Sequence, residues 1–298
     1  MNRFLLLLAV FLVSTAGLFA HQALAEATPL AIAAWRLGLA AVFFLGLSFV
    51  APSRKTQAPL TSPTRLRLCL AGFCLAAHFV TWFGALDYTP VARATLLACT
   101  TPLWTTLGGF LLGRRRPSGR DLLALAIASI GLLLVTHTAA QSPSPRTLLG
   151  DCLGLTAGML FGIYLLCVEG LHETISSQRQ VTVAYSVAAL VLWASLLVRG
   201  SVSFSYSPGV WHALLGMTLG PQIFGHTLIN WSLRHFPSSR VAFAILLEPV
   251  IAAGLAWGLL HQAVTPLQTL GGLLVLVALA VVIGQQAPEE HIENEPVG

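Results

Sequence analysis

Charged residues are scarce in this chain. They make up 9% of its 298 residues, whereas hydrophobic residues make up 56%. Soluble domains carry about 25% charged residues, so the composition excludes the soluble classes of protein. The formal net charge of +5 does not indicate nucleic-acid binding, because the basic residues lie in short loops between apolar segments and act there as orientation signals. We expect a multi-pass protein of the cytoplasmic membrane whose partner is the lipid bilayer.

Motifs of catalysis and metal binding are lacking as well. His172 and Glu173 are not followed by a second His at the spacing of zinc peptidases, and there is no nucleophile elbow or phosphate loop. The five cysteines have neither zinc-like nor redox spacing and all lie in apolar segments, so packing is their expected role. We expect no metal, no cofactor and no enzymatic activity. Because membrane enzymes can lack such motifs, an enzyme acting on a lipid-linked substrate remains the alternative.

Apolar segments dominate what is present. A membrane-spanning helix needs about 20 predominantly apolar residues. Ten segments qualify, the fifth by extending into residues 136–138, and they predict an all-α integral membrane protein with ten transmembrane helices. The segments are residues 4–20, 30–50, 66–86, 91–112, 122–135, 148–168, 181–198, 210–233, 241–260 and 267–283.

The first segment has two interpretations. Arg3, the apolar run from Phe4 and the triplet Ala23-Leu24-Ala25 resemble a signal peptide with its cleavage site. The alternative is a retained first span. We favour retention, because the internal symmetry of the chain needs this segment.

The basic residues are unevenly divided between the two sides of the predicted bundle. With both termini cytoplasmic, the outside loops hold only Arg93, Arg146 and Arg199, and the inside loops hold the larger set. This positive-inside bias supports an even number of spans. Residues 287–298 are predicted to form an acidic, disordered cytoplasmic tail. The inside set is Arg3, Arg54, Lys55, Arg65, Arg67, Arg114, Arg115, Arg116, Arg120, Arg179, Arg234 and Arg240.

The two halves of the chain repeat each other. Residues 1–138 and 148–286 each contain five spans, and an odd number makes the two repeats inverted. Inverted repeats are typical of secondary transporters, whose substrate site lies near the midplane where the repeats meet. At an offset of 147 residues, Pro90, Arg93 and Pro102 fall on Pro237, Arg240 and Pro249; at 148, His78 falls on His226.

Glu248 is the acid placed deepest in a predicted span. An ionised carboxylate in hydrocarbon costs a few kcal/mol or more, so such residues often mark a substrate or proton path. Pro249 follows it and leaves the carbonyl of Ile245 without its usual helical partner. The competing interpretation is a protonated carboxyl that bonds a neighbouring helix.

A polar stripe crosses the eighth segment. Thr218, Gln222, His226 and Asn230 are four residues apart and share one helical face, and Gly220-Pro221 is expected to interrupt that helix. Such residues can also simply bond neighbouring helices. The matching face of the third segment carries Cys74, His78 and Trp82.

Other candidates have competing structural roles. Thr101 holds the position of Glu248 in the first half, but its hydroxyl can instead satisfy a carbonyl freed by proline. Arg36 can snorkel outward, pair with an acid or attract an anionic substrate group. Tyr164 can line a cavity or sit at the membrane interface. The row Gly154, Gly158 and Gly162 predicts close helix packing.

Several of these segments resemble a known family. Residues 86–94 (LDYTPVARA) and 101–104 (TPLW) resemble the first-half signature of the drug/metabolite transporter superfamily, in its EamA branch. Residues 247–250 (LEPV) resemble its second-half partner, and Pro29 with Trp35-Arg36-Leu37 resembles the start of its second span. The resemblance implies two inverted five-helix EamA repeats around a central cavity, and export of amino acids or other metabolites, with uptake in some branches.

One departure from that family pattern stands out. The family often has a glutamate just after the fourth and ninth spans, where this chain has Arg114 and Gln262. No role of those acids can be transferred to this protein.

We expect a secondary transporter, acting as an exporter of a small polar metabolite such as an amino acid by alternating access. Glu248 would be its polar anchor or proton-linked group. Protons are a candidate coupling ion because Glu and His can titrate. A receptor or assembly factor is a further alternative, and no oligomeric state is predicted. The hydrogen-bonding partners would be Gln222, His226 and Asn230, and the opposite wall His78, Trp82 and Thr101.

Overall fold

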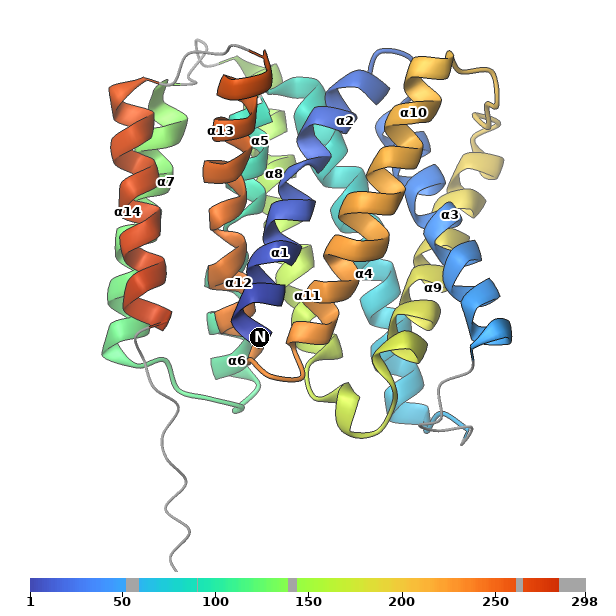
Figure 1. Ribbon diagram of the computed structural model, residues 1–298, viewed down its shortest axis with the longest axis horizontal. Coiled ribbons are helices and arrows are strands. Elements are labelled where there is room, and N and C mark those ends of the chain that lie inside the picture. Colours follow the sequence, from blue (N-terminus) through green and yellow to red (C-terminus); the bar gives the residue numbers. More distant parts are fainter. Residues whose placement is uncertain (52–58, 90, 139–143, 261–264, 284–298) are drawn as a thin grey trace, which may run out of the picture.

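The computed structural model describes residues 1–51, 59–89, 91–138, 144–260 and 265–283, and this part of the chain is helical throughout, with no strand. Figure 1 shows the long helices standing side by side in one bundle. The helices are α1 (Asn2–Ser14), α2 (Ala16–Ala23), α3 (Pro29–Val50), α4 (Ser62–Tyr88), α5 (Val91–Ala98), α6 (Thr101–Leu111), α7 (Gly119–Thr138), α8 (Pro145–Val168), η1 (Leu171–Glu173), α9 (Ser177–Val198), α10 (Pro208–Met217), η2 (Thr218–His226), α11 (Thr227–Ser232), α12 (Ser238–Ile245), α13 (Leu247–Leu260) and α14 (Pro266–Ile283).

Several helices begin with the same local chemistry. The side chains of Thr28, Ser144 and Ser207 each accept a hydrogen bond from a backbone N–H in the first turn, and each residue is followed directly by proline. Such a cap satisfies one of the unpaired donors at a helix start, and proline at the first position removes another. Short polar loops can therefore restart an apolar helix with fewer backbone N–H groups left unpaired.

The helices are apolar enough to cross a membrane in at least six places. By length and composition these are Asn2–Ala23, Pro29–Val50, Ser62–Tyr88, Pro145–Glu173, Ser177–Val198 and Ser238–Leu259, with the shorter Pro266–Val282 beside them. The other predicted spans correspond to α5 with α6, to α7, and to α10 with η2 and α11. The predicted extension of the fifth segment is confirmed, because α7 continues to Thr138. The count of ten crossings stays a prediction.

Helices from the two ends of the sequence pack against each other. The most extensive pairs are α4 with α8, α7 with α14, and α3 with α9, each joining the first 138 residues to the remainder. In Figure 1, α1 begins and α14 ends at the lower end of the bundle. The start of the first described helix and the end of the last thus lie at the same end of the bundle, as the predicted placement of both termini on one side of the membrane requires. Arg54, Lys55, Pro90, Gln262 and the tail 287–298 lie outside the described residues.

Two helices are broken just before a proline. The first break, at Cys99 and Thr100, separates α5 from α6 ahead of Pro102, and the second, at Leu246, separates α12 from α13 ahead of Pro249. The hydroxyl of Thr101 donates to the carbonyl of Ala98 at 3.0 Å.

The two breaks also contact each other. The carbonyl of Ile245, predicted to lose its helical partner, accepts a hydrogen bond from the thiol of Cys99 at 3.8 Å. Cysteine is a weak donor, so this bond adds to the packing role expected of Cys99 rather than replacing it.

The eighth predicted span corrects one expectation. Gly220 and Pro221 do not interrupt it; residues Thr218–His226 instead form a π-helix that joins α10 to α11 without a gap. A π turn closes its hydrogen bonds over five residues, so the wider winding accommodates the N–H that proline lacks. The four polar residues of the stripe are all buried, as predicted for one face.

The glycine row of α8 meets the break between α5 and α6. A Cβ built on Gly158 would lie 2.5 Å from the hydroxyl of Thr100 and 2.8 Å from the carbonyl oxygen of Ala98. Gly154 and Gly162 approach Leu97 and Trp104 in the same way, at 2.8 and 2.7 Å. The prediction of close packing is confirmed, and the row holds the broken helix in place.

Gly158→Ala is expected to lower the stability of the protein by about 2 kcal/mol, because overpacking typically costs 1–3 kcal/mol and the backbone of Ala98 cannot rotate away. The control is Gly46→Ala in α3, where a new Cβ meets nothing within 4 Å. Alanine favours a helix over glycine, so the control should be as stable as the parent or more so. Thermal unfolding in detergent compares the two, and equal melting temperatures would contradict this account of the row.

Candidate functional site

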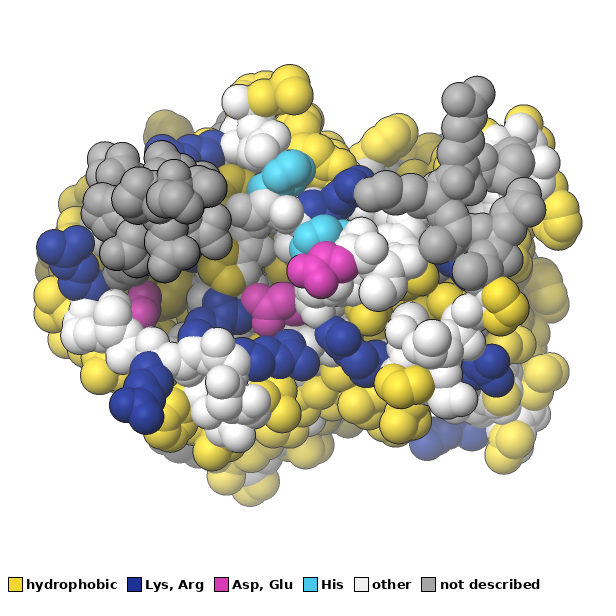
Figure 2. Space-filling model, turned by 90° about the horizontal axis from the view of Figure 1, so that it is seen from below, with side chains coloured by type: hydrophobic (Ala, Val, Ile, Leu, Met, Phe, Trp, Pro, Cys, Tyr) yellow, Lys and Arg dark blue, Asp and Glu magenta, His cyan; other side chains and the backbone are white. Residues whose placement is uncertain are grey.

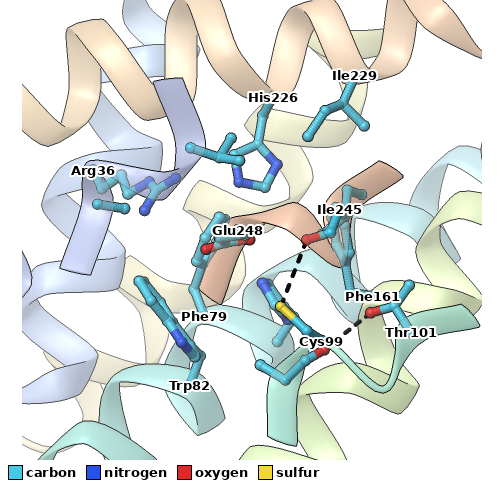
Figure 3. A pocket seen from close by; sticks show the side chains of 14 residues that line it. Arg36, Phe79, Trp82, Cys99, Thr101, Phe161, His226, Ile229, Ile245 and Glu248 are labelled. Carbon is cyan, nitrogen blue, oxygen red and sulfur yellow. Dashed lines mark hydrogen bonds between the residues drawn. The ribbon is translucent and has the colours of Figure 1, made fainter. Parts of the chain in front are cut away.

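A small cavity lies where the two helix breaks meet. Its walls include Cys99 and Thr101 beside the first break, and Ile245 and Glu248 beside the second. Helices α1, α2, α3, α4, α8 and α11 and the π-helix complete it, so both sequence halves contribute. Figure 3 shows the polar side chains converging on this space. The cavity volume is about 30 Å³, enough for one or two water molecules.

Arg36 of α3 is buried at the wall of this cavity, with 1% of its surface exposed. Its Nε donates a 2.8 Å hydrogen bond to Oε1 of Gln222, and the guanidinium lies 4.2 Å from the ring centre of Phe79. Neither Nη1 nor Nη2 has a hydrogen-bond partner among the described residues. The structure therefore excludes outward snorkelling.

Glu248 is the second residue of α13 and the acid among the cavity-lining residues. Its side chain is partly exposed, because it faces the cavity rather than a packed neighbour. In Figure 3 its carboxylate and the guanidinium of Arg36 point toward the same space. Among the described residues no ion pair within 4.0 Å joins them. A positive and a negative group thus flank the cavity without neutralising each other directly.

Two histidines form an aromatic wall with two phenylalanines. His78 and His226, paired by the predicted repeat, both contact Phe79 and Phe161, with ring centres 4.8 to 5.4 Å apart. Nδ1 of His78 lies 2.9 Å from the carbonyl oxygen of Ala157. A carbonyl can only accept, so we assign the proton of His78 to Nδ1. Nδ1 of His226 has no partner among the described residues.

Three predicted site residues lie behind the cavity wall. Gln222 does not line the cavity, but it accepts a hydrogen bond from Arg36, which does. Asn230 accepts hydrogen bonds from the hydroxyl of Tyr164 at 2.7 Å and from Nε2 of Gln180 at 3.1 Å. These contacts tie α11 to α8 and α9. The structure thus places Asn230 and Tyr164 in a helix-joining network, outside the cavity lining.

Thr101 and Trp82 do line the cavity. The hydroxyl of Thr101 is occupied by the carbonyls of Ala98 and Gly158, at 3.0 and 3.3 Å, which is the structural role weighed for it. Trp82 is buried and offers an apolar surface. Sequence reasoning missed Phe79 and Phe161, because an aromatic residue within an apolar helix carries no signal. It missed Gln180 because the predicted span began one residue later.

A cluster of charges ties the helices together at the lower end of the bundle. We call it the Glu169 cluster: Glu169, Arg67, Arg114, Arg115 and Ser238. Glu169, just after α8, pairs with Arg115 at 2.6 Å and Arg114 at 3.3 Å and accepts the backbone N–H of Ser238 at 2.8 Å. Arg67 donates to the carbonyls of Cys167 and Glu169. Figure 2 shows acids and arginines side by side across this face.

The opposite end has its own polar links between the halves. Arg93 of α5 makes a two-pronged contact with Asp151 of α8, at 2.7 and 2.5 Å. The carboxylate of Glu26, between α2 and α3, accepts the backbone N–H of Ser207 at 2.8 Å. The hydrogen bonds from Ser207 lower the pKa of Glu26 below its ordinary value. Both ends are therefore bridged, with the cavity between them.

A helical bundle with an apolar surface and a small polar cavity at paired helix breaks is the architecture expected of a membrane transporter. The sequence profile of the EamA-like transporter family matches residues 3–137 and again residues 148–284. The chain therefore belongs to the EamA-like transporter family and is a multi-pass cell-membrane protein.

Similar proteins agree with this assignment. An uncharacterised transporter of Archaeoglobus fulgidus is 24% identical over 94% of this chain and 97% of its own length. A probable amino-acid metabolite efflux pump of Escherichia coli is 26% identical over 69% of this chain and 72% of its own. A solved crystal structure matches with a TM-score of 0.74 at 16% identity, covering 94% of this chain and 96% of that one, which supports the fold. The chain is thus a transporter by family, in keeping with the expectation that it is not an enzyme.

Proposed function

We propose that this transporter exports a small polar organic metabolite, such as an amino acid, by alternating access around the central cavity. The observation that carries the proposal is that Arg36 and Glu248 line one cavity without forming an ion pair with each other. Charged groups deep in a membrane protein face a solute path or pair with each other. The Escherichia coli relative, named a probable amino-acid metabolite efflux pump, supports this substrate class.

The two bridged ends suggest how access alternates. In this proposal, the Glu169 cluster closes one end of the bundle, and the contact between Arg93 and Asp151 closes the other. A cavity of about 30 Å³ is too small for a metabolite, so one set of contacts must open before a solute enters. The inverted repeats 1–138 and 148–286, supported by the two family matches, would move against each other around the helix breaks.

Counterflow in proteoliposomes tests the proposal. Vesicles containing the purified protein are loaded with a mixture of unlabelled amino acids, and uptake of each labelled one is followed. The expected result is transient accumulation that requires both the protein and the internal solute. A membrane enzyme would instead convert its substrate in detergent, and a receptor would bind without accumulation. Accumulation equal to that of protein-free vesicles would contradict the proposal.

A further inference from the structure

The guanidinium of Arg36 has hydrogen-bond donors for which the described residues supply no acceptor. Its Nε is held by Gln222 and its face lies over Phe79, so the group is fixed in position. Nη1 and Nη2 are buried and have no partner among the described residues. Buried donors left unsatisfied are destabilising, and charged groups more so than neutral ones. A ligand that accepts hydrogen bonds from both nitrogens would remove this cost.

The shape of the free donors identifies the accepting group. A guanidinium presents its N–H groups as a planar fork, which matches the two oxygens of a carboxylate. A phosphate ester also fits such a fork, but it carries a second negative charge. Glu248 lines the same cavity and would repel that extra charge. The single carboxylate is therefore the better match.

Glu248 adds a second requirement. A solute with a carboxylate alone would bind Arg36 and leave Glu248 without a counter-charge. A solute with an amine alone would bind Glu248 and leave Arg36 unpaired. An unpaired charge in a buried site is strongly unfavourable, so only a solute that carries both groups satisfies both residues.

We propose that Arg36 and Glu248 form a two-point site for a zwitterion, with Nη1 and Nη2 of Arg36 binding its carboxylate and Glu248 binding its ammonium group. This inference deepens the proposed function and rests on it, because it takes the same cavity as the transport site. Gln222 is a positioning residue that orients the guanidinium through Nε. Phe79, Trp82 and Phe161 would contact the substituent of the solute.

The test compares three matched classes of compound on the wild-type protein. The first is the set of protein L-amino acids, such as phenylalanine. The second class contains the same compounds without the carboxylate, such as phenethylamine. The third class contains the same compounds without the amine, such as 3-phenylpropionate. Binding is measured as a thermal shift in detergent, and transport as counterflow. At least one amino acid should bind at least tenfold more tightly than both of its matched compounds.

The outcomes separate this inference from the proposed function. Amines or acids that bind as tightly as their parent amino acids would overturn the zwitterion site, while their counterflow would still support transport. Selective binding of amino acids without any counterflow would support the site and count against the transport proposal. Absence of binding and of counterflow by every amino acid would overturn the zwitterion site.

Variants of Arg36 give a second measurement. Arg36→Lys keeps the charge but loses the fork, so affinity for the bound amino acid should fall at least tenfold. Arg36→Gln should lower it further, while any binding of phenethylamine should not weaken. Arg199→Gln, an exposed position outside the cavity, is the matched control and should bind as the parent does. Unchanged affinity in a folded Arg36→Gln protein would overturn the site.

Discussion

Glu248→Gln should reduce transport at least tenfold and flatten the dependence of transport on pH. The amide keeps the volume of the side chain but cannot carry the negative charge that faces Arg36 across the cavity. In the proposed site Glu248 pairs with the ammonium group of the solute, and removing one partner of a buried charge pair costs about 2–5 kcal/mol in binding, so the loss should be large. Initial rates of counterflow in proteoliposomes, taken across a range of external pH, measure both effects.

A matched control shows whether the effect depends on a carboxylate in the cavity or on the loss of any carboxylate. Asp87→Asn removes an exposed carboxylate near the end of α4, away from the cavity lining. It should transport at the parental rate and with the parental pH profile. If Glu248→Gln also behaved like the parent, the carboxylate would have no part in either solute binding or proton coupling.

Glu169→Gln should lower the stability of the protein by about 2 kcal/mol. An exposed ion pair contributes about 0–1 kcal/mol, but Glu169 is only 17% exposed and bonds Arg114, Arg115 and Ser238 together. Breaking a well-buried pair costs about 3–5 kcal/mol, and an intermediate value follows from intermediate burial. Thermal unfolding in detergent, repeated at high salt, measures the change.

Glu173→Gln is the matched control for this position. Glu173 lines the same surface hollow as Arg67, Arg114, Arg115 and Glu169, yet its carboxylate has no hydrogen bond or ion pair among the described residues. Its loss should leave the melting temperature within one degree or so of the parent. A drop in the control as large as in Glu169→Gln would mean that overall charge, rather than the cluster, sets stability.

Much of the helical bundle could be predicted from the sequence, because a segment that crosses the bilayer must be apolar and long enough to span it. Apolar length predicted the long helices, and Pro249 predicted that the carbonyl of Ile245, beside one of the two breaks, would lose its helical partner. The breaks themselves were not predicted, because residues 91–112 and 241–260 each form one continuous apolar segment.

Glu248 was predicted to face a cavity because a charge is costly elsewhere within an apolar helix, and it lines one. Arg36 had three competing interpretations, and its burial at the cavity wall excludes one of them, outward snorkelling. The repeat offset paired His78 with His226 and predicted them on opposite walls; both line the cavity, but they contact the same two phenylalanines, Phe79 and Phe161.

The remaining features depend on contacts between segments far apart in sequence. The side chain of Asn230 turns to Tyr164 and Gln180, and nothing in its own helix indicates those partners. Gly220-Pro221 signalled a break, but the wider π turn satisfied the backbone instead. The Glu169 cluster could not be predicted from spacing, because Arg67, Arg114 and Ser238 come from three separate segments.

The thiol of Cys99 has a practical consequence. It bridges the two helix breaks, and only 2% of its residue surface is exposed. A small thiol-alkylating reagent can reach it only while the breaks separate and the cavity widens. In a protein whose other cysteines are replaced by serine or alanine, the rate of labelling at Cys99 would therefore report how often a single molecule opens. Cys99 would thus report the proposed opening of the cavity without an introduced label site.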